Sequence, residues 1–148
     1  MGRAPVIVGA IDIGSNSVRL LVRNDRGEDL RRDAVVTGLA RGVDAGGPLS
    51  DDAVAATLDV IARYRAVLDE LGAHRTHAVA TSASRDAPNG PDVMATIGTL
   101  LGHVPEIISG EREASLSFAG ATAGIGSPGR QVVVDIGGGS TEVIQGDG

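Results

Sequence analysis

The pattern of apolar and polar positions predicts a meander of three strands at the start of the chain. Apolar runs over residues 6–11 and 18–22 flank the small polar segment 14–17, a pattern typical of a β-hairpin. On the second of these strands Ser17 and Arg19 share one face, because side chains alternate along a strand. Residues 30–37 predict the third strand, and a glycine-rich loop follows.

Helices and strands alternate after this meander. Apolar residues recur at helical spacing from Ser50, which can cap a helix, to Gly72, which can end one. The later elements that we expect are a strand over 76–81, a loop over 82–87, a helix over 92–101, a strand over 105–108, and a helix from about residue 111 that should pack closely on its neighbours.

The pattern then begins again. An apolar run over residues 131–134 opens a hairpin that extends to residue 146, and a segment rich in glycine and serine precedes it. We therefore expect an α/β protein whose mixed sheet is flanked by helices. The expected parts are a first domain over 1–126, a linker over 127–130, and the opening hairpin of a truncated second domain over 131–148. On this interpretation the sequence is a fragment of a longer protein.

Both predicted hairpins carry the motif Asp-Ile-Gly where their first strand ends. The motif begins at Asp12 in one hairpin and at Asp135 in the other. Glycine-rich turns leave backbone N–H groups free to bind phosphate oxygens, and carboxylates beside them can hold a hydrated Mg²⁺ ion. The repeat predicts two loops that face a shared cleft, unless both are ordinary tight hairpins. The candidate phosphate ligands are Gly14, Ser15, Asn16, Ser17, Arg19, Gly137, Gly138, Gly139, Ser140 and Thr141, and the candidate ligands of Mg²⁺ or another divalent cation are Asp12, Asp135 and Glu142.

Composition narrows the classes of function. The 148 residues are 42% hydrophobic and contain no cysteine, which excludes disulfides and thiolate metal sites. A net charge of −6 argues against a broad surface for nucleic acid or for an anionic membrane. No apolar run approaches the length of about 18 residues that a membrane span needs, and the N-terminus lacks a signal-peptide pattern. We therefore expect a cytoplasmic protein.

Five segments extend the pattern beyond the two motifs: residues 11–20, 42–44 with 49–50, 81–87, 108–114 and 134–142. In this order they resemble the exopolyphosphatase and guanosine pentaphosphate phosphatase (Ppx/GppA) family, within the superfamily of actin, sugar kinases and heat-shock chaperone ATPases. Either Asp-Ile-Gly motif alone indicates only the superfamily, whereas Thr81–Ala87 together with Ser109–Ala114 narrows the resemblance to the family. The resemblance implies two ribonuclease-H-like (actin-like ATPase) domains that close on a cleft.

The resemblance also implies two catalytic residues. It places the family's catalytic glutamate at Glu113, not Glu111, where the side chain would orient the attacking water or accept its proton. Arg85 follows a strand end, so its guanidinium could bind a phosphate bidentately or simply pair with Asp86. An acid at position 113 is favoured by the helix dipole alone, so the residues by themselves leave both interpretations open.

The leading hypothesis is a metal-dependent hydrolase that removes the terminal phosphate from inorganic polyphosphate or guanosine pentaphosphate. The alternatives are an ATP-dependent kinase or ATPase of the same superfamily, and a non-catalytic sensor of phosphate-rich ligands. We expect the 148-residue fragment alone to be inactive, because one wall of its cleft is only a hairpin. The sequence leaves a homodimer open.

Overall fold

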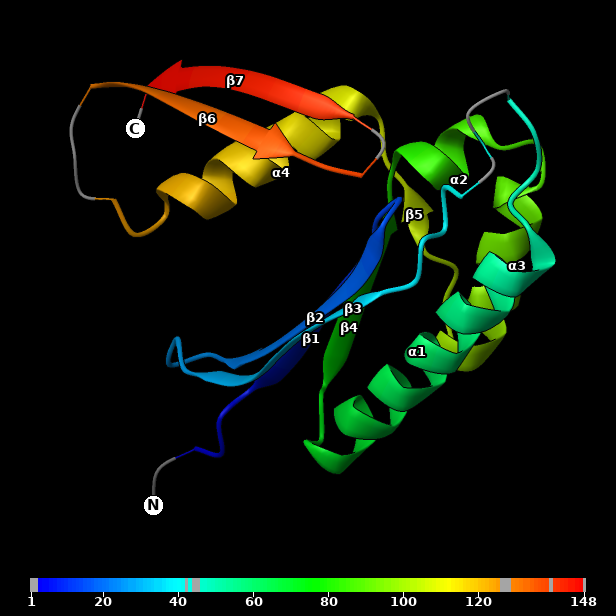
Figure 1. Cartoon of the computed structure of the whole chain (residues 1–148). Coiled ribbons are helices and arrows are strands. Elements are labelled where there is room, and N and C mark those ends of the chain that lie inside the picture. The colour runs from blue at the N-terminus through cyan, green and yellow to red at the C-terminus, as the bar shows by residue number, and fades with distance from the viewer. Residues whose placement is uncertain (1–2, 42, 44–45, 126–128, 139, 148) are drawn as a thin grey trace.

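The computed structural model describes residues 3–41, 43, 46–125, 129–138 and 140–147 (Figure 1). The predicted linker therefore lies partly outside the described residues, as does Gly139. The elements, in chain order, are β1 (Ile7–Ile13), β2 (Ser17–Asn24), β3 (Asp29–Val36), α1 (Asp51–Glu70), β4 (Arg75–Ala80), α2 (Ser82–Asp86), α3 (Gly90–Leu101), β5 (Glu106–Ile107), α4 (Gly110–Thr122), β6 (Arg130–Ile136) and β7 (Thr141–Asp147).

A five-stranded sheet in the order β3-β2-β1-β4-β5 forms the centre of the fold. β1 is antiparallel to β2 and parallel to β4, so the predicted mixed sheet is confirmed. The parallel register pairs Ile13 with Ala80, which brings the ends of β1 and β4 to the same edge of the sheet. The segments that follow these two strands carry most of the predicted site residues, and they therefore start side by side.

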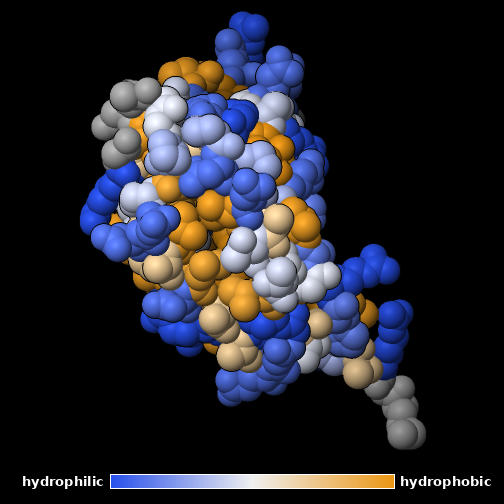
Figure 2. Space-filling model, turned by 90° about the vertical axis from the view of Figure 1, so that its right-hand side faces the viewer, coloured by the Kyte–Doolittle hydropathy of each residue, from blue (hydrophilic) through white to orange (hydrophobic). Residues whose placement is uncertain are grey.

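The core lies between this sheet and the helices α1 and α3 (Figure 1). Along β2, Val18 and Val22 are buried while Arg19 is exposed, as the alternation predicted. The Tyr64 hydroxyl of α1 donates a hydrogen bond to the carbonyl of Val18 over 3.1 Å, which satisfies its polar atom inside the core. Apolar side chains also remain visible on the side of the molecule that carries α1 and α3 (Figure 2), where Leu100 is 38% exposed.

The long predicted helix is confirmed at both ends. Ser50 caps α1 by accepting a hydrogen bond from the backbone N–H of Ala53, and Gly72 follows the helix with a φ of 66°. Among the described residues, no helix combines the length and apolarity that crossing a membrane would require.

Two local predictions were wrong. Residues 82–86, expected as a loop, form the short helix α2, because the Thr81 carbonyl accepts hydrogen bonds from the N–H groups of Ser84 and Arg85 at 3.1 Å each. A helix of five residues is too short to leave a periodic pattern. The helix α4, all of whose residues are described, has no buried residue, although its small side chains suggested close packing.

Strands β6 and β7 form a separate two-stranded sheet that packs along α4. In Figure 1 α4 and this hairpin lie on the opposite side of the five-stranded sheet from α1. The hairpin's tip touches the first hairpin: a Cβ added at Gly138 would lie 2.4 Å from the Cβ of Asn16. Glycine at position 138 therefore permits a close approach between the two loops.

We predict that Gly90→Ala destabilises the fold. A Cβ at position 90 would lie 1.8 Å from the carbonyl oxygen of Ser84, and the backbone of α2 cannot move away without displacing Arg85. Overpacking costs about 1–3 kcal/mol in cores, so the free energy of unfolding in urea should fall by at least about 2 kcal/mol.

The matched control for this substitution is Gly120→Ala in α4. A Cβ there meets no atom within 4 Å, and alanine is favoured over glycine in a helix by about 1 kcal/mol. This variant should be as stable as the wild type or more stable. Equal stability of the two variants would contradict the contact between Gly90 and α2.

Candidate functional site

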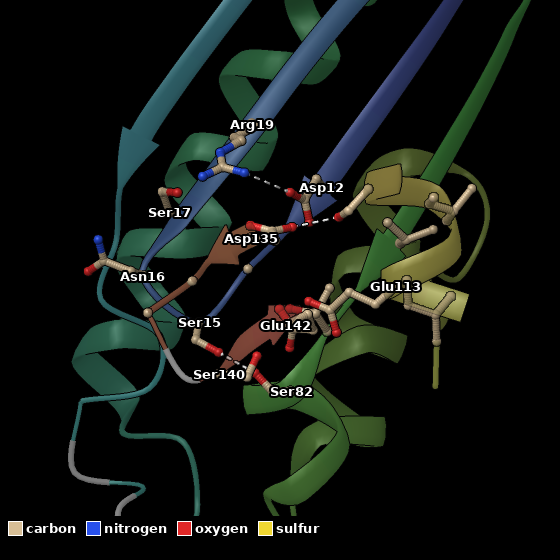
Figure 3. A pocket seen from close by; sticks show the side chains of 18 of the residues that line it. Asp12, Ser15, Asn16, Ser17, Arg19, Ser82, Glu113, Asp135, Ser140 and Glu142 are labelled. Carbon is tan, nitrogen blue, oxygen red and sulfur yellow. Dashed lines mark hydrogen bonds and ion pairs between the residues drawn. The ribbon is translucent and has the colours of Figure 1, made fainter. Parts of the chain in front are cut away.

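A cavity of about 400 Å³ lies where the tips of the two hairpins meet the first turn of α4 (Figure 3). The predicted residues that line it are Asp12, Gly14, Ser15, Asn16, Ser17, Arg19, Glu113, Asp135, Gly137, Gly138, Ser140 and Glu142. The cavity therefore brings together candidates from both Asp-Ile-Gly hairpins. Thr141 and Arg85, which the structure describes, are not among its lining residues, and Gly139 lies outside the described part of the chain.

The two Asp-Ile-Gly loops close in the same way. The N–H of Gly14 donates to the carbonyl of Ser17 at 3.0 Å, and the N–H of Gly137 donates to the carbonyl of Ser140 at 2.9 Å. A Cβ at either glycine would lie 3.1 Å from the accepting oxygen. Neither glycine has a positive φ, so this tight approach, rather than an unusual dihedral, favours glycine there. The repeat in the sequence is thus a repeat in structure.

Asp12 sits at the end of β1, directly across from Arg19 on β2. Their side chains form an ion pair of 3.6 Å (Figure 3). Burial raises the pKa of the Asp12 carboxyl, Arg19 opposes this rise, and the nearby Asp135 carboxylate adds to it. Arg19 therefore offsets part of the cost of placing carboxylates from both hairpins in one cavity.

Ser15 has a different environment from the one expected of a phosphate ligand. Its side chain is buried, its Oγ lies 2.8 Å from the Oγ of Ser82, and it accepts a hydrogen bond from the N–H of Ala83 at 3.2 Å. Thr81, at the N-cap of α2, makes no side-chain capping bond, so Ser15 supplies the cap from a distant loop. The hydroxyl thereby ties the first Asp-Ile-Gly loop to the helix that carries Arg85.

Arg85 contacts Glu113. Its Nη1 donates to the carbonyl of Ile108 at 2.8 Å and lies 3.6 Å from Oε2 of Glu113, while its Nε lies 3.6 Å from Asp86. The cap at Ser109, which accepts from the N–H of Arg112, begins α4 and sets Glu113 in its first turn. The arginine predicted to bind phosphate is thus held next to the predicted catalytic glutamate.

The Glu113 side chain is only 17% exposed, and its Oε2 is buried without a hydrogen-bond partner among the described residues. Burial raises the pKa of this carboxyl, the Glu142 carboxylate raises it further, and Arg85 lowers it. A carboxylate with a raised pKa is suited to accept a proton from water.

The carboxylates form two neighbouring pairs rather than one cluster. Asp135 faces Asp12, and Glu142 lies beside Glu113 (Figure 3). Within the described residues, no group of three or more His, Cys, Asp or Glu side chains could hold a metal ion. The pair Asp12 and Asp135 nevertheless fits Mg²⁺, which is commonly bound by one or two carboxylates together with waters and substrate phosphates.

Two serines in this region were not predicted from the sequence. Ser82 pairs with Ser15, and Ser117 of α4 donates a hydrogen bond of 2.5 Å to Oδ2 of Asp135. The sequence gives no signal for Ser82, because its partner lies 67 residues away in the chain. Ser117 could have been found, since it follows Glu113 by one helical turn and must share its face.

Comparison with known proteins identifies the family. Residues 20–148 match the Ppx/GppA phosphatase family. The chain belongs to this family. Exopolyphosphatase 2 of Mycobacterium tuberculosis is 41% identical over 95% of this chain, and a guanosine-5'-triphosphate,3'-diphosphate pyrophosphatase of Vibrio cholerae is 36% identical over 96% of it. The chain spans 48% of the first relative's length and 29% of the second's.

Solved structures of Ppx/GppA proteins share the fold. A Ppx/GppA enzyme of Aquifex aeolicus superposes with a TM-score of 0.85 at 34% identity, covering 98% of this chain and 50% of its own. An exopolyphosphatase of Cytophaga hutchinsonii gives a TM-score of 0.89 at 32% identity, covering 95% of this chain and 46% of its own. The predicted family and actin-like ATPase fold are thus confirmed.

We predict that Ser15 and Ser82 are energetically coupled. Ser15→Ala removes the acceptor for the N–H of Ala83 and leaves the Ser82 hydroxyl without its partner, so the free energy of unfolding should fall by about 1–3 kcal/mol. A double-mutant cycle with Ser82→Ala, measured by urea unfolding, should give a coupling energy of at least about 0.5 kcal/mol. Additive losses would show that the two hydroxyls act independently.

We also predict a raised pKa for Glu113 in the metal-free protein. Carboxyl ¹³C titration should give a value above the ordinary one of about 4.3, and Glu142→Gln should lower it by removing a like charge. The folded state then holds this proton more tightly than the unfolded chain. The stabilising contribution of Glu113 is complete below the unfolded pKa and is lost as the pH rises through the folded pKa. A Glu113 pKa at or below the ordinary value would contradict this environment.

Proposed function

We propose that this chain forms the phosphate-binding half of a metal-dependent hydrolase that removes the terminal phosphate from inorganic polyphosphate or guanosine pentaphosphate. One observation carries the proposal: both glycine loops and Glu113 face a single cavity. A phosphoanhydride substrate is supported by the names of the two relatives, an exopolyphosphatase and a guanosine-5'-triphosphate,3'-diphosphate pyrophosphatase.

The two loops bind the phosphate chain from opposite sides in this proposal. The N–H groups of Gly14 and Gly137 close the two loops, so other backbone N–H groups of these loops contact phosphate oxygens, and Ser17 and Ser140 add hydroxyl donors. Arg19, 61% exposed at its side chain, contributes a positive charge at the rim of the cavity. Asp12, Asp135 and Glu142 would hold Mg²⁺, directly or through water, and a bound ion would neutralise charge on the phosphate oxygens.

Glu113 acts as the general base. A water molecule beside its carboxylate attacks the terminal phosphorus, its proton passes to Glu113, and the phosphoanhydride bond to the leaving phosphate breaks. The products are inorganic phosphate and a substrate shortened by one phosphate. Arg85 holds the Glu113 carboxylate from one side, and its guanidinium can turn toward the transferred phosphoryl group when substrate enters.

We further propose that the hairpin β6–β7 begins a second domain, as the division at residues 126–131 predicted. The chain spans about half the length of the first exopolyphosphatase that it matches, at 48%. An isolated two-stranded hairpin is marginally stable, and here Val134, Ile136 and Val143 of the hairpin are more than half exposed. A second domain that extends the hairpin's sheet would cover these residues and complete the second wall.

The test compares Glu113→Gln with Glu111→Gln, an exposed glutamate in the same helical turn. Released phosphate is measured with Mg²⁺ and, separately, polyphosphate, guanosine pentaphosphate or ATP, using both this chain and the chain joined to a second domain. We expect the form with both domains to act on polyphosphate or guanosine pentaphosphate. Glu113→Gln should lower its turnover by about 10²–10⁴-fold, the usual effect of losing a positioned base, while Glu111→Gln should leave turnover unchanged.

Other outcomes would redirect the proposal. Turnover of ATP alone would indicate a kinase or ATPase, and binding of the phosphate compounds without turnover would indicate a sensor. Equal rates from this chain with and without the second domain would show that the second domain is not needed to complete the cavity. Unchanged turnover in Glu113→Gln would remove Glu113 from the mechanism.

A further inference from the structure

We propose that Ser117 is a positioning residue, which holds the Asp135 carboxylate in the orientation that binds the divalent cation. This inference rests on the proposed function, because it assumes that Asp135 is a cation ligand. Ser117 belongs to α4, whereas Asp135 lies on β6, so the contact joins the helix to the hairpin. Both side chains line the cavity.

The hydrogen bond between them has a defined direction. The Ser117 Oγ lies 2.5 Å from Oδ2 of Asp135, a distance typical of a hydroxyl bound to a carboxylate. An ionised carboxylate can only accept, so the serine donates. Oδ1 of Asp135 then remains for the cation. In Figure 3 Asp135 lies beside Asp12.

The Ser117 hydroxyl donates to the neighbouring strand and not to a carbonyl of its own helix. Serine and threonine in helices often bond to a backbone carbonyl one turn earlier, and Thr122 in the same helix does so, donating to the carbonyl of Phe118 at 2.8 Å. Ser117 instead directs its hydroxyl to Asp135.

Asp135 needs such a restraint. It pairs across the hairpin with Glu142 and faces Asp12 across the cavity, so like charges lie on two sides of it. Without a donor, repulsion favours rotation of the carboxylate toward solvent. The hydrogen bond from Ser117 opposes that rotation in the absence of the cation. The Asp135 side chain therefore loses less conformational entropy when the cation binds.

The same helix face carries Glu113, one turn before Ser117. A single rigid element therefore sets the proposed base directly and the proposed cation ligand through a hydrogen bond. α4 packs on both β6 and β7, so the proposed base and the proposed cation ligand belong to one packed unit.

Binding of Mn²⁺, followed by the electron paramagnetic resonance signal of the free ion, tests the proposal without measuring activity. We expect Ser117→Ala to weaken Mn²⁺ binding by about tenfold or more, the lower end of the usual effect of losing a residue behind a metal ligand. Ser117→Thr, which keeps the hydroxyl, should bind like the wild type. Ser115→Ala is the matched control, because Ser115 lies on the same helix and is exposed.

Thermal unfolding of each variant without metal separates positioning from simple loss of stability. Weaker Mn²⁺ binding in Ser117→Ala alone, at a temperature where all four proteins are folded, supports the proposal. Equal Mn²⁺ affinity in Ser117→Ala and the wild type overturns it and leaves the proposed function standing. If the wild-type form with both domains and its Asp135→Asn variant both fail to bind Mn²⁺ while the wild-type form still releases phosphate, the cation site and the role of Ser117 are both wrong but the hydrolase is not.

Discussion

The parallel pairing of β1 with β4 is the constraint on which the rest of the site depends. It places the ends of both strands at one edge of the sheet, so the loop after Ile13 and the helix after Ala80 begin next to each other. The buried contact between Ser15 and Ser82 becomes possible only through this register. β5 joins the same edge, and α4 then begins at the cavity with Glu113 in its first turn.

The charge balance of the cavity explains why a cation and a phosphate chain suit it together. Four carboxylates line it, from Asp12, Glu113, Asp135 and Glu142. Arg19 pairs with one of them and Arg85 with another, both over 3.6 Å. Burial is the main cause that raises the pKa values of Asp12 and Glu113, and neighbouring carboxylates add to it, so the two arginines offset only part of the cost of placing these carboxylates in one cavity. A divalent cation would relieve it and at the same time attract an anionic substrate.

Among the described residues, the hairpin β6–β7 contacts the rest of the chain mainly through α4. α4 packs along it, Phe118 fills the space beside Gly146, and Gly138 touches Asn16. Ser117 adds the hydrogen bond to Asp135. The Asp-Ile-Gly loop of this hairpin is therefore located by α4, the same helix that carries the proposed base.

The sequence by itself determined the elements with strong local signals and the types of residue at the site. The alternation along β2, the cap at Ser50 and the stop at Gly72 depend on nearby residues, so each was predictable. The repeated Asp-Ile-Gly motif also predicted two equivalent loops, and their matching hydrogen bonds bear this out.

Only the tertiary structure decided how these parts meet. The short helix α2 depends on a cap from Ser15, and Arg85 contacts Glu113 because β4 and β5 are neighbours in the sheet. The division of the carboxylates into two pairs, and the bond from Ser117 to Asp135, depend on how α4 packs against the hairpin. These contacts join residues far apart in the chain, and their geometry follows from strand register and packing, which no local pattern of side chains records.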